Sequence, residues 1–143
     1  MVFKLHSDAK FSVDKDGKID GPYKRYYALF PASLYFVCNY THGVRDGAFT
    51  EYFSNGNVAS RGMFVNDKRH GTVTTFCDGG QILRVENYNH GVLHGEYIVY
   101  NKKNIEGYAT FYYMGDDLRV NPSSLTEKDK TYIMISGRLP PKD

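Results

Sequence analysis

The sequence predicts an all-β repeat protein: an elongated single-layer antiparallel sheet of tandem β-hairpins that ends in a short C-terminal capping helix. The first observation is a fixed period, because similar segments begin at Gly47, Gly71 and Gly95, which are 24 residues apart. The second is turn chemistry, since Asn55-Gly56 stands between two apolar runs, the strongest short-range signal for a hairpin. The third is composition, because 14 glycines, 13 tyrosines and 9 phenylalanines suit β-strands joined by tight turns. A regular period in this range is typical of repeat proteins.

The length of 143 residues suits a single domain. We expect a hairpin array over residues 9–118, a C-terminal cap over residues 119–138 and a tail over residues 139–143. One hairpin alone is only marginally stable in water, so the packing of equivalent positions against each other must stabilise the array.

The first full unit, residues 21–46, is two residues longer than the units that follow it. Proline fixes φ and donates no hydrogen bond to a ladder, so Pro31 is expected in a loop. The flanking strands are predicted near residues 22–28 and 34–41.

Equivalent positions in successive hairpins carry similar side chains. The three aromatic columns are Tyr52, Phe76 and Tyr100; Phe49, Val73 and Tyr97; and Phe64, Tyr88 and Tyr112. Alternation of apolar and polar residues is imperfect, as the neighbours Tyr52 and Phe53 show. This pattern predicts either a bulge in each strand or a sheet that is half-buried on both faces.

After Leu118 the repeat pattern stops, and the segment 124–127 reads as a capping box that begins a helix. Gly137 is the expected stop of that helix. Its apolar stripe is predicted to consist of Leu125, Tyr132, Ile133 and Ser136. The alternative is a last strand over residues 131–136, because Thr-Tyr-Ile-Met-Ile favours β structure.

Charge and composition exclude several classes of function. The net charge is +2, with 18 basic and 16 acidic residues interspersed, so no basic patch indicates a nucleic-acid surface. We expect no membrane association, because the sequence has neither a polybasic cluster nor a spanning apolar run. The first residues lack the apolar run of a signal peptide, and there are only two cysteines. These features favour a soluble protein of the cytoplasm.

The repeated frame reads Gly47…Tyr52-Phe53-Ser54-Asn55-Gly56…Phe64-Val65-Asn66-Asp67…His70-Gly71, and it recurs at residues 88–95 and more weakly at residues 40–47. This frame resembles the MORN repeat, in the variant common in bacterial and phage proteins and described there as an antitoxin-like family. The resemblance covers residues 14–118 and implies a twisted single-layer sheet that serves as an interaction or scaffolding surface. Some eukaryotic relatives were linked to phospholipid head groups or fused to enzymes. The chain departs from the pattern at Pro31, at residues 103–104 and at Arg119, which stands where the next repeat glycine would fall.

The histidines are the candidate residues for catalysis or metal binding. Asp46, His70 and His94 occupy the same column of successive units, and such a ladder has the chemistry of a metal or acid–base site in a hydrolase. Aspartate and histidine before glycine are also ordinary turn residues of this repeat, and we favour that interpretation. Cys38 and Cys77 fall in different columns and are expected to be inert. We therefore expect a protein that is not an enzyme and holds no metal or cofactor.

The aromatic residues favour a binding function. Three aromatic columns exceed what one thin core needs, and exposed aromatic side chains on a rigid surface are typical of interfaces. The expected binding residues are Tyr52, Phe76 and Tyr100, with Arg61, Arg84 and Glu86 at the rim. The favoured function is non-enzymatic binding of another protein, as an antitoxin-like or inhibitory partner in a bacterial or phage cytoplasm. Sequestration of a small ligand, such as a nucleotide signal, between aromatic columns is the alternative, and self-association is left open.

Overall fold

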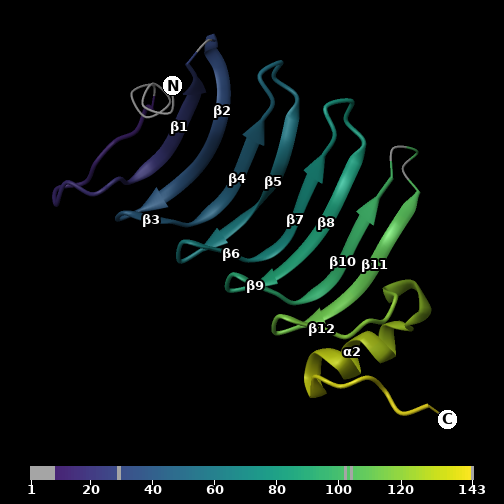
Figure 1. Cartoon of the computed structure of the whole chain (residues 1–143). Helices are drawn as coiled ribbons and strands as arrows, with labels where there is room; N and C mark the ends of the chain where they lie inside the picture. The colour runs from purple at the N-terminus through teal and green to yellow at the C-terminus, as the bar shows by residue number, and fades with distance from the viewer. Residues whose placement is uncertain (1–8, 29, 102, 104, 143) are drawn as a thin grey trace.

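The protein is an open, twisted antiparallel sheet of twelve strands with one short helix at its C-terminal end (Figure 1). This computed structural model describes residues 9–28, 30–101, 103 and 105–142. The long strands are β1 (Gly21–Tyr27), β2 (Phe30–Thr41), β4 (Gly47–Tyr52), β5 (Val58–Val65), β7 (Gly71–Phe76), β8 (Ile82–Asn89), β10 (Gly95–Tyr100) and β11 (Glu106–Tyr113). Two-residue strands follow each hairpin: β3 (Val44–Arg45), β6 (Lys68–Arg69), β9 (Val92–Leu93) and β12 (Asp116–Asp117). The predicted architecture of tandem hairpins in one layer is confirmed.

Two kinds of turn join the strands, and each suits its residues. Within a unit, Phe53 N–H donates to Asn57 O and Gly56 N–H donates to Phe53 O, while only Gly56 has a positive φ. This is a type I turn closed by a glycine bulge, and the hairpin predicted at Asn55-Gly56 is present. Between units, both central residues are left-handed, as at His90 (φ 46°) and Gly91 (φ 88°). Such turns match the right-handed twist of the strands that they join.

A bulge lies at the same place in every repeated hairpin. The register of β4 and β5 shifts between Glu51 and Tyr52, and the same shift recurs between Thr75 and Phe76 and between Val99 and Tyr100. The sequence left two explanations for the imperfect alternation, a bulge in each strand or a sheet half-buried on both faces. The bulge is present in all three units.

The sheet has two unlike faces. Phe49, Phe64 and Val73 are buried on one of them together with Cys38, and this side is called the core face. Phe49 stacks on Phe64 with ring centroids 4.7 Å apart and contacts Phe36 at 6.2 Å. Twist brings neighbouring columns together, so a single layer can bury these rings without a second sheet.

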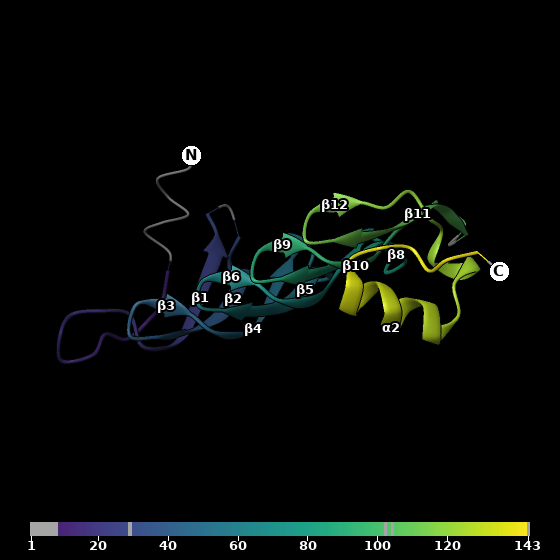
Figure 2. The ribbon, with the colours of Figure 1, turned by 90° about the horizontal axis from the view of Figure 1, so that it is seen from below.

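The opposite side is called the helix face, because α2 (Glu127–Ser136) packs on it at the C-terminal end of the array (Figure 2). Ile133 is fully buried, Lys130 pairs with Glu96 at 2.6 Å, and Gly137 packs against the ring of Tyr113. Glu96 lies opposite Phe111, which is buried on the same face. The helix therefore covers β10 and β11.

The helical interpretation of the C-terminus is confirmed, and the strand over residues 131–136 is wrong. The capping box lies two residues later than predicted, because Thr126 and Asp129 cap α2 reciprocally while Ser124 ends the 3-10 helix η1 (Pro122–Ser124). Gly137 ends α2 in the left-handed conformation, as expected. Of the predicted apolar stripe, only Ile133 is buried.

The prediction of a loop around Pro31 is wrong, because β2 begins at Phe30 and includes it. The pairing of β1 with β2 is irregular here, since Tyr26 pairs with Leu34 and Tyr27 with Phe30. Among the described residues, β2 pairs with β4 at Phe36 and Val37, which lie away from Pro31, so the proline takes no ladder hydrogen bond from this pairing.

Candidate functional site

The column of Asp46, His70 and His94 lies at the junctions between units. The Nδ1 atom of His70 accepts a hydrogen bond from His90 N–H at 3.2 Å, and Nδ1 of His94 accepts one from Met114 N–H at 2.9 Å. In the leading unit, Asp20 accepts a bond from His42 N–H at 2.9 Å in the same way. The side chains of Asp20, His70 and His94 thus each hold the turn of the next unit.

The rings of these histidines are packed against neighbours of their own junction. His70 stacks on His90 with ring centroids 4.6 Å apart, and His94 packs on Tyr113 at 5.0 Å. Burial lowers the pKa of His94, which favours the neutral ring that the bond from Met114 requires. Within the described residues, no metal-ligating group of three includes the predicted candidates Asp46, His70 and His94.

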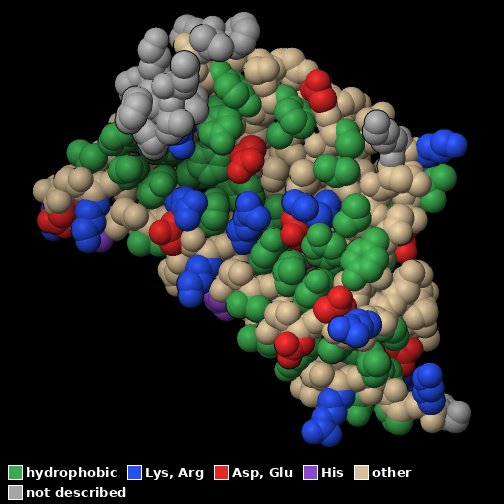
Figure 3. Space-filling view, in the orientation of Figure 1, with side chains coloured by type: hydrophobic (Ala, Val, Ile, Leu, Met, Phe, Trp, Pro, Cys, Tyr) green, Lys and Arg blue, Asp and Glu red, His purple; other side chains and the backbone are tan. Residues whose placement is uncertain are grey.

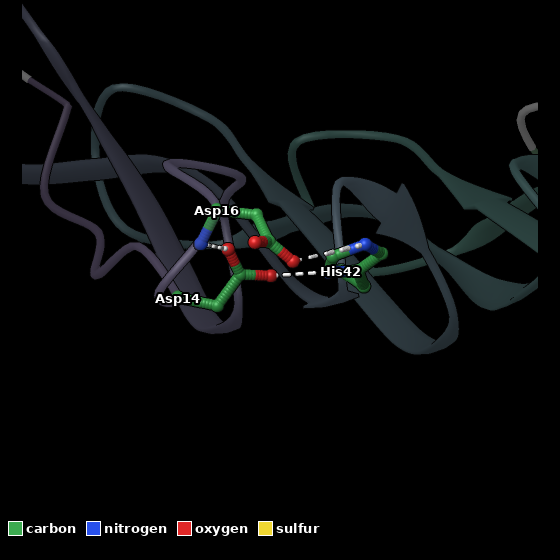
Figure 4. A group of neighbouring side chains, drawn as sticks. All are labelled: Asp14, Asp16 and His42. Atoms are coloured by element: carbon green, nitrogen blue, oxygen red, sulfur yellow. Dashed lines mark hydrogen bonds and ion pairs between the residues drawn. The ribbon is translucent and has the colours of Figure 1, made fainter.

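One cluster with metal-ligand chemistry does occur in the described part of the chain, and sequence reasoning missed it. Asp14 and Asp16 lie in the turn before β1, and His42 reaches them from the next turn (Figure 4). Nδ1 of His42 contacts Oδ2 of Asp14, and Nε2 lies 3.9 Å from Oδ2 of Asp16. The Asp-x-Asp spacing could have pointed to this cluster from the sequence, but His42 lies beside the two aspartates only because β1 and β2 pair in the sheet.

The carboxylate of Asp14 in this cluster stabilises the turn in which it lies. Oδ1 of Asp14 accepts bonds from the N–H groups of Asp16 and Lys18 at 2.9 and 3.0 Å. Burial acts to raise the pKa of Asp14, but the bonds from Lys18 and His42 outweigh it and keep that pKa below its usual value. Because the carboxylate already accepts these bonds, a metal ion would have to replace the contact with His42.

The predicted binding row of Tyr52, Phe76 and Tyr100 lies on the helix face. Arg61 pairs with Thr50 on one side and Thr74 on the other, so these three side chains share a face. Phe76 follows Thr74 by two residues, and the guanidinium of Arg61 lies 5.2 Å from its ring centroid. Tyr52 and Tyr100 occupy the equivalent ends of β4 and β10. The row is half-buried and stands opposite the core.

The structure does not bring Arg84 and Glu86 to that row. Arg84 pairs with Thr75 and Val99, and Glu86 pairs with Val73, which places both on the core face. Glu86 is only 6% exposed and accepts bonds from Arg84 Nε at 3.0 Å and from the hydroxyl of Tyr88 at 2.9 Å. Placing these two residues at the rim of the Phe76 row is therefore wrong, because that interpretation assumed one shared face.

The core face also carries arginines stacked on aromatic rings. Arg45 lies over Phe64 at 4.3 Å and Arg69 over Tyr88 at 5.8 Å. Figure 3, which looks onto the side of the sheet away from α2, shows Lys and Arg side chains in a row among hydrophobic ones. Arg45 is also paired with Asp67, and Arg84 with Glu86, so much of this charge is compensated locally.

A shallow groove crosses the uncovered part of the helix face. One part, of about 310 Å³, is lined by residues of β4, β5 and β7 that include Ala48, Met63 and Thr74. The next part, of about 450 Å³, reaches the edge of α2 at Lys130 and Met134. Thr72 lines both parts, so the two adjoin at this residue.

Cys38 offers no reactive thiolate at neutral pH. Cys38 is buried in the core, and burial raises the pKa of its thiol to about 11. Cys77 is half-buried rather than buried. Both thiols are free.

The chain is thus an open hairpin-repeat protein in which one face of the sheet carries the core cluster and α2 covers part of the other. No family model matches the chain, and a search of curated proteins finds no significant match. Within the described residues, no helix has the length and apolar character needed to cross a bilayer.

Proposed function

We propose that the chain is a non-enzymatic protein-binding module, an antitoxin-like or inhibitory partner protein of a bacterial or phage cytoplasm. The observation that carries this proposal is the row of Tyr52, Phe76 and Tyr100, which recurs in register on the face opposite the core. Arg61 lies over the central ring of the row. Aromatic residues and arginine are the side chains that most often anchor protein interfaces.

The architecture supports this proposal in two ways. The row stands on hairpins whose pairing and bulges repeat from unit to unit, so its side chains are held before a partner arrives. The rings are half-buried, and therefore part of each ring remains available for contact. The resemblance to MORN repeats points in the same direction, because it implies an interaction surface.

Affinity capture from a bacterial lysate, followed by mass spectrometry, tests the proposal when it compares matched baits. The wild type should capture a protein that Phe76→Ala fails to retain. The control bait Val13→Ala changes an exposed apolar residue far from the row and should retain it. If all three baits capture the same proteins in equal amounts, the row is not the binding surface.

The two alternatives have their own experiments. A hydrolase built on the histidine column would lose its activity in the double variant His70→Ala/His94→Ala while the fold persists. A protein that sequesters a nucleotide would show saturable heat in calorimetry against candidate nucleotides. Either result would replace the proposal of protein binding.

A further inference from the structure

The helix α2 has apolar residues on two opposite sides. Ile133 points to the sheet and is 0% exposed, whereas Ile135 is 79% exposed. At 100° per residue, two positions along a helix differ by about 200°, so Ile135 points away from the sheet that Ile133 contacts. A largely exposed isoleucine of this kind marks a surface that gains free energy when another apolar surface covers it.

The helix face has a second surface that resembles the one α2 covers. On its own sheet, α2 covers Phe111, a residue of the helix face. The equivalent residue two repeats earlier is Met63, which remains exposed and lines the groove over β4, β5 and β7. Ala48 and Thr72, which also line this groove, are small and leave room for a side chain to enter.

We propose that two copies of the chain form a twofold symmetric dimer in which the α2 of each copy lies on the helix face of the other. Ile135 enters the groove beside Met63, so that each α2 is packed between two sheets. The arrangement is isologous: the same two surfaces, α2 and the groove, meet twice. It closes on itself and leaves no unpaired copy of either surface.

Charge complementarity supports a second copy as the occupant. Arg61 lines the groove, and its guanidinium stacks on Phe76 without a carboxylate partner in the described part of the chain. Glu127, in the first turn of α2, has a side chain that is 90% exposed, and it shares its partner Lys130, 3.1 Å away, with Glu96. In the dimer, Glu127 of one copy faces Arg61 of the other.

The size of the contact sets its expected strength. α2 has ten residues, and a helix of that length is about 15 Å long and roughly 10 Å wide. Two such contacts cover about 300 Å² of each copy and roughly 600 Å² in all, which lies below the range of about 1,200–2,000 Å² for stable interfaces and is typical of weak ones. We therefore expect a weak dimer that dissociates on dilution below roughly 100 µM.

Sedimentation velocity of the full chain from about 1 to 200 µM tests this inference. The wild type should shift from monomer to dimer across this range. Ile135→Asp should weaken the association by about 30-fold or more, as the loss of an interface anchor does. The control Ile105→Asp changes a residue that is 57% exposed in a hairpin turn and should leave the dimer intact. Circular dichroism of each variant checks that the sheet is retained.

A charge exchange then tests which surfaces meet. Arg61→Glu and Glu127→Arg should each weaken the dimer, and the double variant should restore it. A wild type that stays monomeric at 200 µM, a dimer unaffected by Ile135→Asp, or a double variant without restoration each overturns the inference. Because Ile135 lies outside the Phe76 row, Ile135→Asp should still capture the protein partner, which keeps this test separate from that of the proposed function.

Discussion

Gly62 tests whether the core of this single-layer sheet lies on one face. It stands in β5 opposite Phe49, in ordinary strand conformation, so space rather than backbone geometry requires glycine here. A Cβ atom would lie 2.8 Å from Cγ2 of Val73 and 2.9 Å from Cε1 of Phe49. Both neighbours are almost completely buried and have little room to move.

The size of the effect follows from two opposed terms. Overpacking a core costs about 1–3 kcal/mol. Replacing glycine by alanine within a strand gains roughly 0.5–1 kcal/mol, because glycine loses more conformational freedom on folding. From the middle of the two ranges, Gly62→Ala should therefore lower the free energy of unfolding by about 1.3 kcal/mol and the melting temperature by roughly 3–6 °C.

Thermal and urea unfolding, followed by circular dichroism, measure this change. Gly107→Ala is the matched control, because Gly107 lies in β11 and its added Cβ would meet only ordinary contacts at 3.5 Å or more. This control should be neutral or slightly stabilising. In a Val73→Ala background, the penalty of Gly62→Ala should shrink, since the nearest clashing methyl is gone. If Gly62→Ala is as stable as the wild type, the assignment of the core face is refuted.

Two further predictions concern the half-buried ring of His94 and the buried carboxylate of Glu86. Burial lowers the pKa of His94 in the folded state, so its neutral ring contributes fully to the free energy of unfolding above the unfolded-state pKa of about 6.5. This contribution should be lost as the pH falls toward the lower folded-state pKa. His94→Asn, which can still accept the bond from Met114, should reduce this pH dependence in urea titrations at several pH values. Glu86→Ala removes the acceptor of the Tyr88 hydroxyl in a buried layer and should lower the free energy of unfolding by about 1–3 kcal/mol, whereas Glu86→Gln, which keeps an acceptor, should cost less; equal losses in denaturant unfolding would contradict this assignment.

The repeat made most of the fold predictable. The spacing of Gly47, Gly71 and Gly95 indicated the hairpins, and Gly137 indicated the end of the helix. The hairpin at Asn55-Gly56 was predicted, but its turn type could not be, because the same dipeptide suits both a turn with two positive φ values and a type I turn with a glycine bulge. Pro31 was misplaced because a strand can include proline where no neighbouring strand needs its N–H.

The candidate site was less predictable, because the faces of a bulged strand cannot be counted from sequence. Phe76 and Glu86 each belong to a repeated column, but only the cross-strand pairs place them on opposite faces. The contact of His42 with Asp14 joins two turns that are 28 residues apart. Nothing in the local sequence of either turn points to the other.

The central claim is that a partner protein binds the row on the helix face, and Phe76→Ala tests it most directly. Affinity for the captured partner and melting temperature are measured on the same purified variant. We expect the dissociation constant to rise at least about 30-fold, as for a hot-spot residue, while the melting temperature changes little because the ring lies outside the core cluster. An unchanged affinity, or a loss of stability of about 3–5 kcal/mol as for a truncated core aromatic, would contradict the claim.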